Sequence, residues 1–114
     1  MDQVTKLNNY RKILPQVLEY HAALPAEPTN AESIPICDPV HDNYLLMDIF
    51  PDPKGSAAHI VVHLRLKNGK VRVERDGIED GIAQDLIKAG VAEKDIEYTF
   101  YGEDPEFFYE SAAA

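Results

Sequence analysis

Apolar side chains at the start of the chain recur at steps of three and four residues. The run extends from Val4 to Leu24, and polar or charged residues occupy the positions between them. This spacing predicts an amphipathic helix over residues 4–24. Pro15 lies inside the run, where a proline removes one backbone donor and clashes with the preceding turn at a cost of about 3 kcal/mol. A kink or two abutting helical segments are therefore expected there.

The pattern changes after this helix. Four prolines fall within residues 25–40, which predicts a connection with at most a short edge strand at residues 34–37. The run NYLLMDIF, residues 43–50, then predicts a buried strand because it is apolar, short and bounded by turn residues on both sides.

Two runs of alternating apolar and polar residues within positions 59–75 meet at Asn68-Gly69. This pair supplies the positive backbone angles that a two-residue turn requires, so the sequence predicts a β-hairpin. Six apolar residues of its two strands are expected to face the helices: Ile60, Val62, Leu64, Leu66, Val71 and Val73.

Apolar residues return to a helical spacing between Ile78 and Ile87, and Gly90 stands where a left-handed helix cap is favoured. A last strand is expected at residues 96–100. Together these elements predict an α+β fold, in which an N-terminal helix and a second helix pack on one face of a small antiparallel sheet. At 114 residues, one domain over residues 1–114 is expected, with a proline-rich connection at about 25–40 and a loose C-terminal tail from about 103.

The chain is acidic, with a formal net charge of -9 and a pI near 4.7. Such a charge repels a phosphate backbone at long range, so the chain is not expected to bind DNA by itself, whereas a basic protein surface would be attracted. The sequence has no apolar run of membrane-spanning length and no signal peptide of the basic-then-apolar type. A soluble, cytoplasmic protein is therefore expected.

Five carboxylates gather in residues 74–85, beside two glycines. Asp76 and Glu79 have the spacing of a capping box, in which two side chains bind backbone amides at the start of a helix. Asp80 would lie in the same first turn, where the helix dipole favours anions. Glu74 is expected on the outer strand face, and Asp85 on the solvated side of the helix. Because the five do not converge on one point, the sequence predicts structural capping rather than a hydrolytic active site.

Possible metal ligands are also scattered. His59 and His63 are four residues apart on a predicted strand, where they would be separated by about 13 Å and could not share one ion. Cys37 is the single cysteine, so it completes no ligand set and forms no internal disulfide. A phosphate loop and a nucleophile elbow are both absent from the sequence. The sequence therefore predicts no metal, no cofactor and no enzyme activity.

Counting outward from the hairpin turn sets Arg65 directly opposite Arg72, on the sheet face away from the helices. The next outer pair is His63 with Glu74. Like charges directly opposite each other destabilise a sheet modestly. One interpretation is a solvated face on which this repulsion is tolerated. The other is a docking site for an acidic partner surface, or for a second copy of the chain in a homo-oligomer. Five residues would form it: His63, Arg65, Lys67, Arg72 and Glu74.

Three segments of the sequence resemble the XisI family, cyanobacterial proteins named as controlling factors for excision of the fdxN element. They are YRKIL in the first helix, HDNYLLM in the first predicted strand, and the block HLRLKNGKVRVERDGIEDGIAQDLIKAGVAEKDI. The resemblance covers residues 7–100. It implies a small α+β domain with a helix against an antiparallel sheet. It also implies an accessory factor that acts with a second, XisH-like protein to regulate a site-specific recombinase.

Two hypotheses for the function remain open on this basis. The first is a non-enzymatic regulatory subunit whose partner is a DNA-processing protein. The second is an antitoxin-like or immunity-like inhibitor that masks a basic, nuclease-like partner by charge. Both need only an acidic surface and one docking face. An enzyme that uses the acidic stretch is the least supported.

Overall fold

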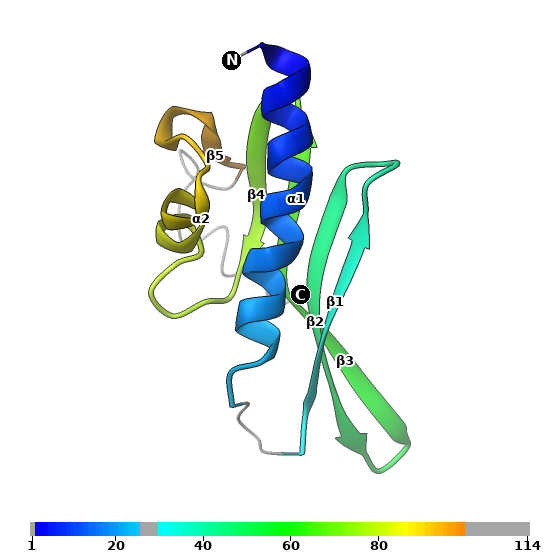
Figure 1. The fold of residues 1–114 in the computed structure, drawn as a ribbon. Helices are drawn as coiled ribbons and strands as arrows, with labels where there is room; N and C mark the ends of the chain where they lie inside the picture. The colour runs from blue at the N-terminus through cyan, green and yellow to red at the C-terminus, as the bar shows by residue number, and fades with distance from the viewer. Residues whose placement is uncertain (1, 26–29, 100–114) are drawn as a thin grey trace.

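The structure, a computed structural model, describes residues 2–25 and 30–99. These residues form a five-stranded sheet with two helices on one of its faces (Figure 1). In chain order the elements are α1 (Gln3–Ala22), β1 (Glu32–Asp38), β2 (Asn43–Asp52), β3 (Gly55–Lys67), β4 (Lys70–Asp76), α2 (Ala83–Ala89), the 3-10 helix η1 (Glu93–Asp95) and β5 (Ile96–Tyr98). The strands lie side by side in this same order. The predicted α+β class is confirmed, whereas the predicted tail from about residue 103 lies outside the described residues.

The sheet is mixed. Strands β1 to β4 pair antiparallel, as predicted, but β5 runs parallel to β4. The direction of β5 follows from its connection, because α2 and η1 carry the chain back to the starting end of β4. Neither helix is long and apolar enough to cross a membrane in the part of the chain that is described.

Helix α1 is capped by Asp2, whose side chain accepts a hydrogen bond from the Thr5 amide at 2.8 Å. It continues through Pro15 as one helix. Of the two expected outcomes, a kink or two abutting segments, the second is therefore wrong. Burying each of its core side chains contributes about 1.5 to 3 kcal/mol. Four such residues lie on both sides of the proline, and together they outweigh its cost of about 3 kcal/mol: Tyr10, Leu14, Val17 and Leu18.

Strand β1 occupies the middle of the predicted proline-rich connection. The short edge strand expected at residues 34–37 is confirmed and is longer than expected, since seven residues of the predicted connection pair with β2. Pro35 lies within β1, opposite Leu46. Proline is tolerated there because β1 is the edge strand, where the missing backbone donor does not interrupt a ladder on both sides.

The predicted hairpin is confirmed. Asn68 and Gly69 both adopt positive φ angles, of 54° and 76°, which are the angles of a turn that matches the twist of the two strands. Lys67 is opposite Lys70, and Arg65 is opposite Arg72.

A bulge interrupts β3 at Val61. Leu46 of β2 pairs with Val62, and the next residue, Met47, pairs with Ile60. The extra residue reverses the in-and-out alternation beyond it. Val61 packs against the core, while Ile60 is 39% exposed. The prediction that Ile60 faces the helices is therefore wrong, and the other five predicted positions are buried: Val62, Leu64, Leu66, Val71 and Val73.

A second bulge lies in β4 at Glu74. Leu64 is opposite Val73, but His63 is opposite Arg75. The predicted pairing of His63 with Glu74 is therefore wrong by one residue, because the bulge inserts Glu74 between two paired positions. The insertion brings Arg75 onto the outer face of the sheet, where alternation alone would not place it.

The core lies between the helices and one face of the sheet. It joins the buried residues of α1 to those of the strands and to Ile82, Leu86 and Val91 around α2. The far ends of β2 and β3 extend beyond both helices (Figure 1). The opposite face of the sheet has no described element over it.

Candidate partner-docking face

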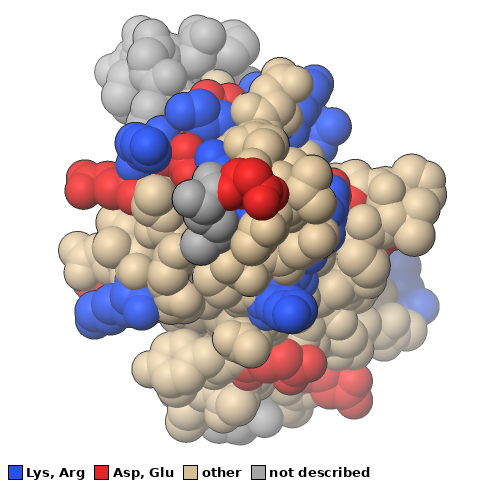
Figure 2. Space-filling model, turned by 45° about the horizontal axis from the view of Figure 1, so that its top comes forward, with Lys and Arg blue, Asp and Glu red and all other residues tan. Residues whose placement is uncertain are grey.

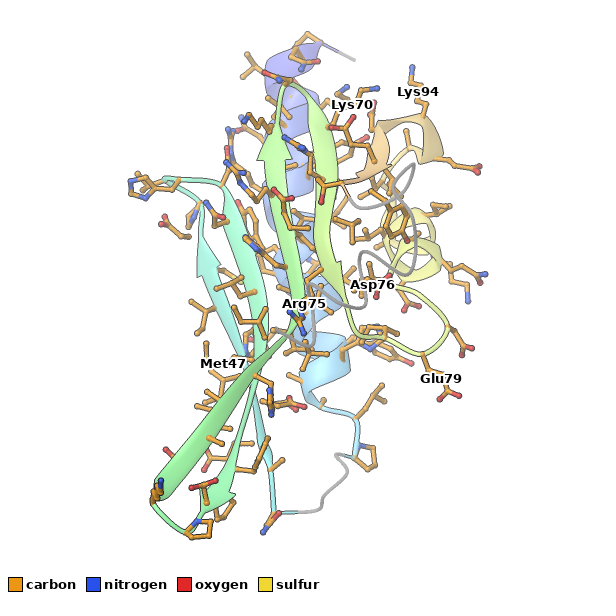
Figure 3. The ribbon with its side chains drawn as sticks, turned by 180° about the vertical axis from the view of Figure 1, so that it is seen from behind. Met47, Lys70, Arg75, Asp76, Glu79 and Lys94 are labelled. Carbon is orange, nitrogen blue, oxygen red and sulfur yellow. The ribbon has the colours of Figure 1, made fainter. Side chains whose placement is uncertain are left out.

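The acidic stretch at residues 74–85 does not form the predicted capping box. Helix α2 begins at Ala83, and Ile82 at its N-cap makes no side-chain capping bond. Asp76 accepts hydrogen bonds from the Ile78 amide at 3.1 Å and the Ile82 amide at 3.0 Å. Asp76 therefore holds the loop between β4 and α2 closed. Glu79 is exposed and points away from the body of the protein (Figure 3).

We expect Asp76→Ala to lower the free energy of unfolding by about 2 kcal/mol, because two backbone amides lose their acceptor. Glu79→Ala should change it by less than about 0.5 kcal/mol, as is usual for an exposed position. Urea denaturation of both variants provides the measurement. In a capping box both side chains would stabilise the helix, so both variants would lose stability. Equal destabilisation of the two variants would therefore contradict the role of Asp76 in closing the loop.

The remaining carboxylates point in different directions. Asp85 does not lie on the solvated side of α2, as expected, but against α1, where its Oδ2 is 2.7 Å from His21 Nε2. The His21 side chain is 9% exposed, so this contact joins the two helices in a partly buried position. Glu74 lies on the outer face. Across residues 2–25 and 30–99, no group of three His, Cys, Asp or Glu side chains is arranged to hold a metal ion.

A buried acidic group that the sequence did not reveal lies in η1. The Tyr10 hydroxyl donates to Asp95 Oδ2 at 2.6 Å, and Lys6 Nζ is 3.2 Å from the same oxygen. Burial alone raises the pKa of Asp95, but Tyr10 and Lys6 outweigh it and hold the pKa below its ordinary value of 3.8. No local signal could have revealed this contact, because Tyr10 and Asp95 are 85 positions apart.

The two opposed arginines of the hairpin each have a carboxylate neighbour. Arg65 Nη1 donates to Glu74 Oε2 at 3.1 Å, and Arg72 Nε lies 3.2 Å from Glu97 Oε1 in an ion pair without hydrogen-bond geometry. The repulsion expected between the arginines is therefore compensated within the chain. Their opposition alone does not indicate a partner.

His63 adds little positive charge to this face. Its Nε2 lies 2.9 Å from Asn43 Oδ1. Burial lowers the pKa of His63 below its ordinary value of 6.5, with Arg65 acting in the same direction and Glu74 opposing. The imidazole is therefore mainly neutral near pH 7.

Two other cations on this face are exposed and free to bind an acidic group of another molecule. Lys67 and Arg75 have no carboxylate within ion-pair distance among the described residues. With Arg65 and Arg72 they form what we term the outer basic zone. Its four cations face two carboxylates, those of Glu74 and Glu97, so the zone is net positive on a chain whose formal net charge is -9.

The helix side differs from the outer basic zone. Figure 2 shows Lys and Arg interspersed with Asp and Glu on that side, with wide areas of uncharged residues between them. The structure thus brings together four of the five residues predicted for docking as charged groups on one face: Arg65, Lys67, Arg72 and Glu74. It adds Arg75, which the sequence did not reveal. Regular alternation along β4 would turn Arg75 toward the core, and nothing in the sequence indicated the bulge at Glu74.

Comparisons with known proteins agree on one family. A profile of the XisI protein family matches residues 1–112. The solved structure of the fdxN element excision controlling factor XisI from Anabaena variabilis ATCC 29413 is 27% identical, with a TM-score of 0.69 over 84% of this chain and 87% of that chain. A XisI-like protein from the same organism has the same TM-score at 22% identity, over 80% and 84% of the two chains, and shares the fold. No match is found among curated proteins.

Proposed function

Because the chain belongs to the XisI family, we propose that it is a non-enzymatic accessory factor that controls excision of a DNA element. In this proposal it acts together with an XisH-like protein to regulate a site-specific recombinase. The chain contributes a docking surface and no chemistry. The fdxN element excision controlling factor of similar structure supports the general role, and the dispersed carboxylates of residues 74–85 support the absence of catalysis.

The observation that carries the proposal is the outer basic zone. Lys67 and Arg75 have no carboxylate neighbour among the described residues, and they lie on a sheet face that no described element covers. Such a face is suited to orient an acidic surface of another protein, since electrostatic complementarity guides encounter and fixes register. The antitoxin-like alternative has less support. Masking a basic nuclease by charge would require an acidic docking face, whereas the outer basic zone is net positive.

Deletion of the gene in its host tests the role in excision. Long-read sequencing of the deletion strain counts the junctions left by excised chromosomal elements. The proposal predicts that the junction frequency of at least one element changes, and that the wild-type gene restores it. Junction frequencies equal to those of the wild type for every element that the host excises would contradict the proposed function.

Binding of duplex DNA by the purified chain should be weak. A net charge of -9 opposes the counterion release that drives such binding, so we expect no affinity tighter than about 1 µM at physiological salt. Fluorescence anisotropy with a labelled duplex measures this directly. Submicromolar binding without a partner would show that the chain contacts DNA itself, against the proposed accessory role.

A further inference from the structure

The outer sheet face carries a second feature next to the outer basic zone. Cross-strand pairs place Ile36 beside Leu45, Ile34 beside Met47, and Met47 beside Ile60. Residues that pair across antiparallel strands lie on the same face of a sheet. We term these five aliphatic residues the outer apolar zone: Ile34, Ile36, Leu45, Met47 and Ile60.

None of the five takes part in the hydrophobic core or packs against it. Ile36 is 42% exposed and Ile60 is 39% exposed. The bulge at Val61 is what turns Ile60 outward. Both helices cover the opposite face of the sheet (Figure 1). The usual arrangement of a sheet covered on one side is apolar residues facing the core and polar residues facing water, so an aliphatic row on the uncovered side indicates a contact surface.

The two zones are continuous across β3. Leu45 of the outer apolar zone pairs with His63, and His63 pairs in turn with Arg75 of the outer basic zone. Figure 3, which looks onto the sheet from the side opposite the helices, shows Met47 and Arg75 on the two sides of β3. A single partner surface can therefore cover both zones.

We propose that the outer apolar zone and the outer basic zone form one docking surface for a heterologous protein whose contact surface has apolar side chains bordered by Asp and Glu. This inference rests on the proposed function and specifies the chemistry of its partner. Aliphatic burial would supply the affinity of the contact, and the cations would supply its orientation and its rate of formation.

A second copy of the chain fits the surface less well. A two-fold contact brings identical patches together. If the axis passed through the outer basic zone, Lys67 and Arg75 would meet their own copies. If it passed between the zones, the cations would be buried against aliphatic side chains, which costs desolvation energy. An axis through the outer apolar zone would leave the cations uncovered. Each copy also carries a formal net charge of -9, which opposes self-association.

The test compares two pairs of substitutions that change no charge. Ile36→Gln with Ile60→Gln removes the exposed members of the outer apolar zone. Ile87→Gln with Val4→Gln is the matched control, since both residues are exposed on the helices. The probe is the purified XisH-like protein of the same host, titrated by calorimetry at low and high salt. We expect the first pair to weaken binding about tenfold or more with its salt dependence retained, and the control pair to stay within about twofold.

The possible outcomes distinguish a failure of the inference alone from a failure of the proposed function. If the wild-type chain binds the probe and the Ile36→Gln, Ile60→Gln variant binds equally well, the inference is wrong and the proposed function stands. If the wild-type chain does not bind the probe, both are overturned. If light scattering shows that the chain alone is a dimer that the same variant dissociates, a second copy covers the outer apolar zone, and the inference is wrong. Ile60→Gln alone serves as the variant if the pair melts early.

Discussion

Replacement of Asp95 by alanine is expected to lower the free energy of unfolding by about 2 kcal/mol. The Asp95 side chain is only 4% exposed, and its removal leaves the Tyr10 hydroxyl without its acceptor in the core, a loss of about 1 to 3 kcal/mol. Lys6 and Lys70 also lose their carboxylate. Both lysines retain access to water, so the cost should stay below that of a fully buried broken ion pair, which is about 3 to 5 kcal/mol.

Glu93→Ala is the matched control for Asp95→Ala, because Glu93 lies in the same 3-10 helix and is exposed. It should change the free energy of unfolding by less than about 0.5 kcal/mol. Chemical denaturation of the two variants and the wild type measures both. Equal effects would show that the hydrogen bond between Tyr10 and Asp95 contributes nothing to stability.

The Asp95 contribution should also depend on pH. Since the folded-state pKa of Asp95 is held below 3.8, the ionised carboxylate stabilises the folded state at pH values above about 3.8. This stability is lost as the pH falls through the lowered folded-state pKa. The difference in stability between wild type and Asp95→Asn, which cannot ionise, isolates the effect. This stability difference should be constant from about pH 7 to pH 5 and shrink below about pH 4. A difference at about pH 3 equal to that at pH 7 would contradict a lowered pKa of Asp95.

Charge reversal in the outer basic zone is expected to weaken partner binding about tenfold or more. The variant is Lys67→Glu with Arg75→Glu, since these two cations have no carboxylate neighbour among the described residues. Arg65 and Arg72 are unsuitable, because a glutamate at either position would face Glu74 or Glu97 and destabilise the sheet. Most of the loss should appear in the association rate, and the difference from wild type should narrow as salt rises.

A control with the same change in net charge is available on the helices. Lys12→Glu with Lys88→Glu alters two exposed lysines on the side opposite the outer basic zone. Biosensor kinetics with the XisH-like protein should show near wild-type binding for this control, and thermal melting checks that both variants fold. Equal loss in the two variants would indicate a general effect of net charge rather than docking by the outer basic zone.

The fold was predictable from the sequence where local chemistry decides it. Asn68-Gly69 specifies the hairpin by itself, because few other residue pairs adopt two successive positive φ angles. The apolar spacing of α1 likewise survives Pro15, since the core contacts on both sides outweigh the proline. The edge strand around Pro35 was predicted over residues 34–37, but its full length, Glu32–Asp38, depends on pairing with β2, which the strand's own sequence does not specify.

The candidate site was predictable only in part, for a related reason. Arg65 and Arg72 follow from counting along the hairpin, whereas Arg75 and Ile60 reach the outer face through bulges. A bulge depends on the neighbouring strand and on contacts such as that of Gly77 N with Val61 O at 2.7 Å. The contacts of Asp76 with the Ile82 amide and of Asp85 with His21 follow from no spacing rule. Sequence periodicity thus predicts faces of regular elements but not the residues that interrupt them.

Mixing the purified chain with the XisH-like protein of its host tests the proposed docking role most directly. Size-exclusion chromatography with light scattering at about 50 µM, well above the dissociation constant of a specific complex, measures the mass of each species. We expect a stable complex of defined stoichiometry that forms without DNA, metal or nucleotide. Two separate peaks with the masses of the unbound proteins would contradict the claim that the chain acts by docking this partner.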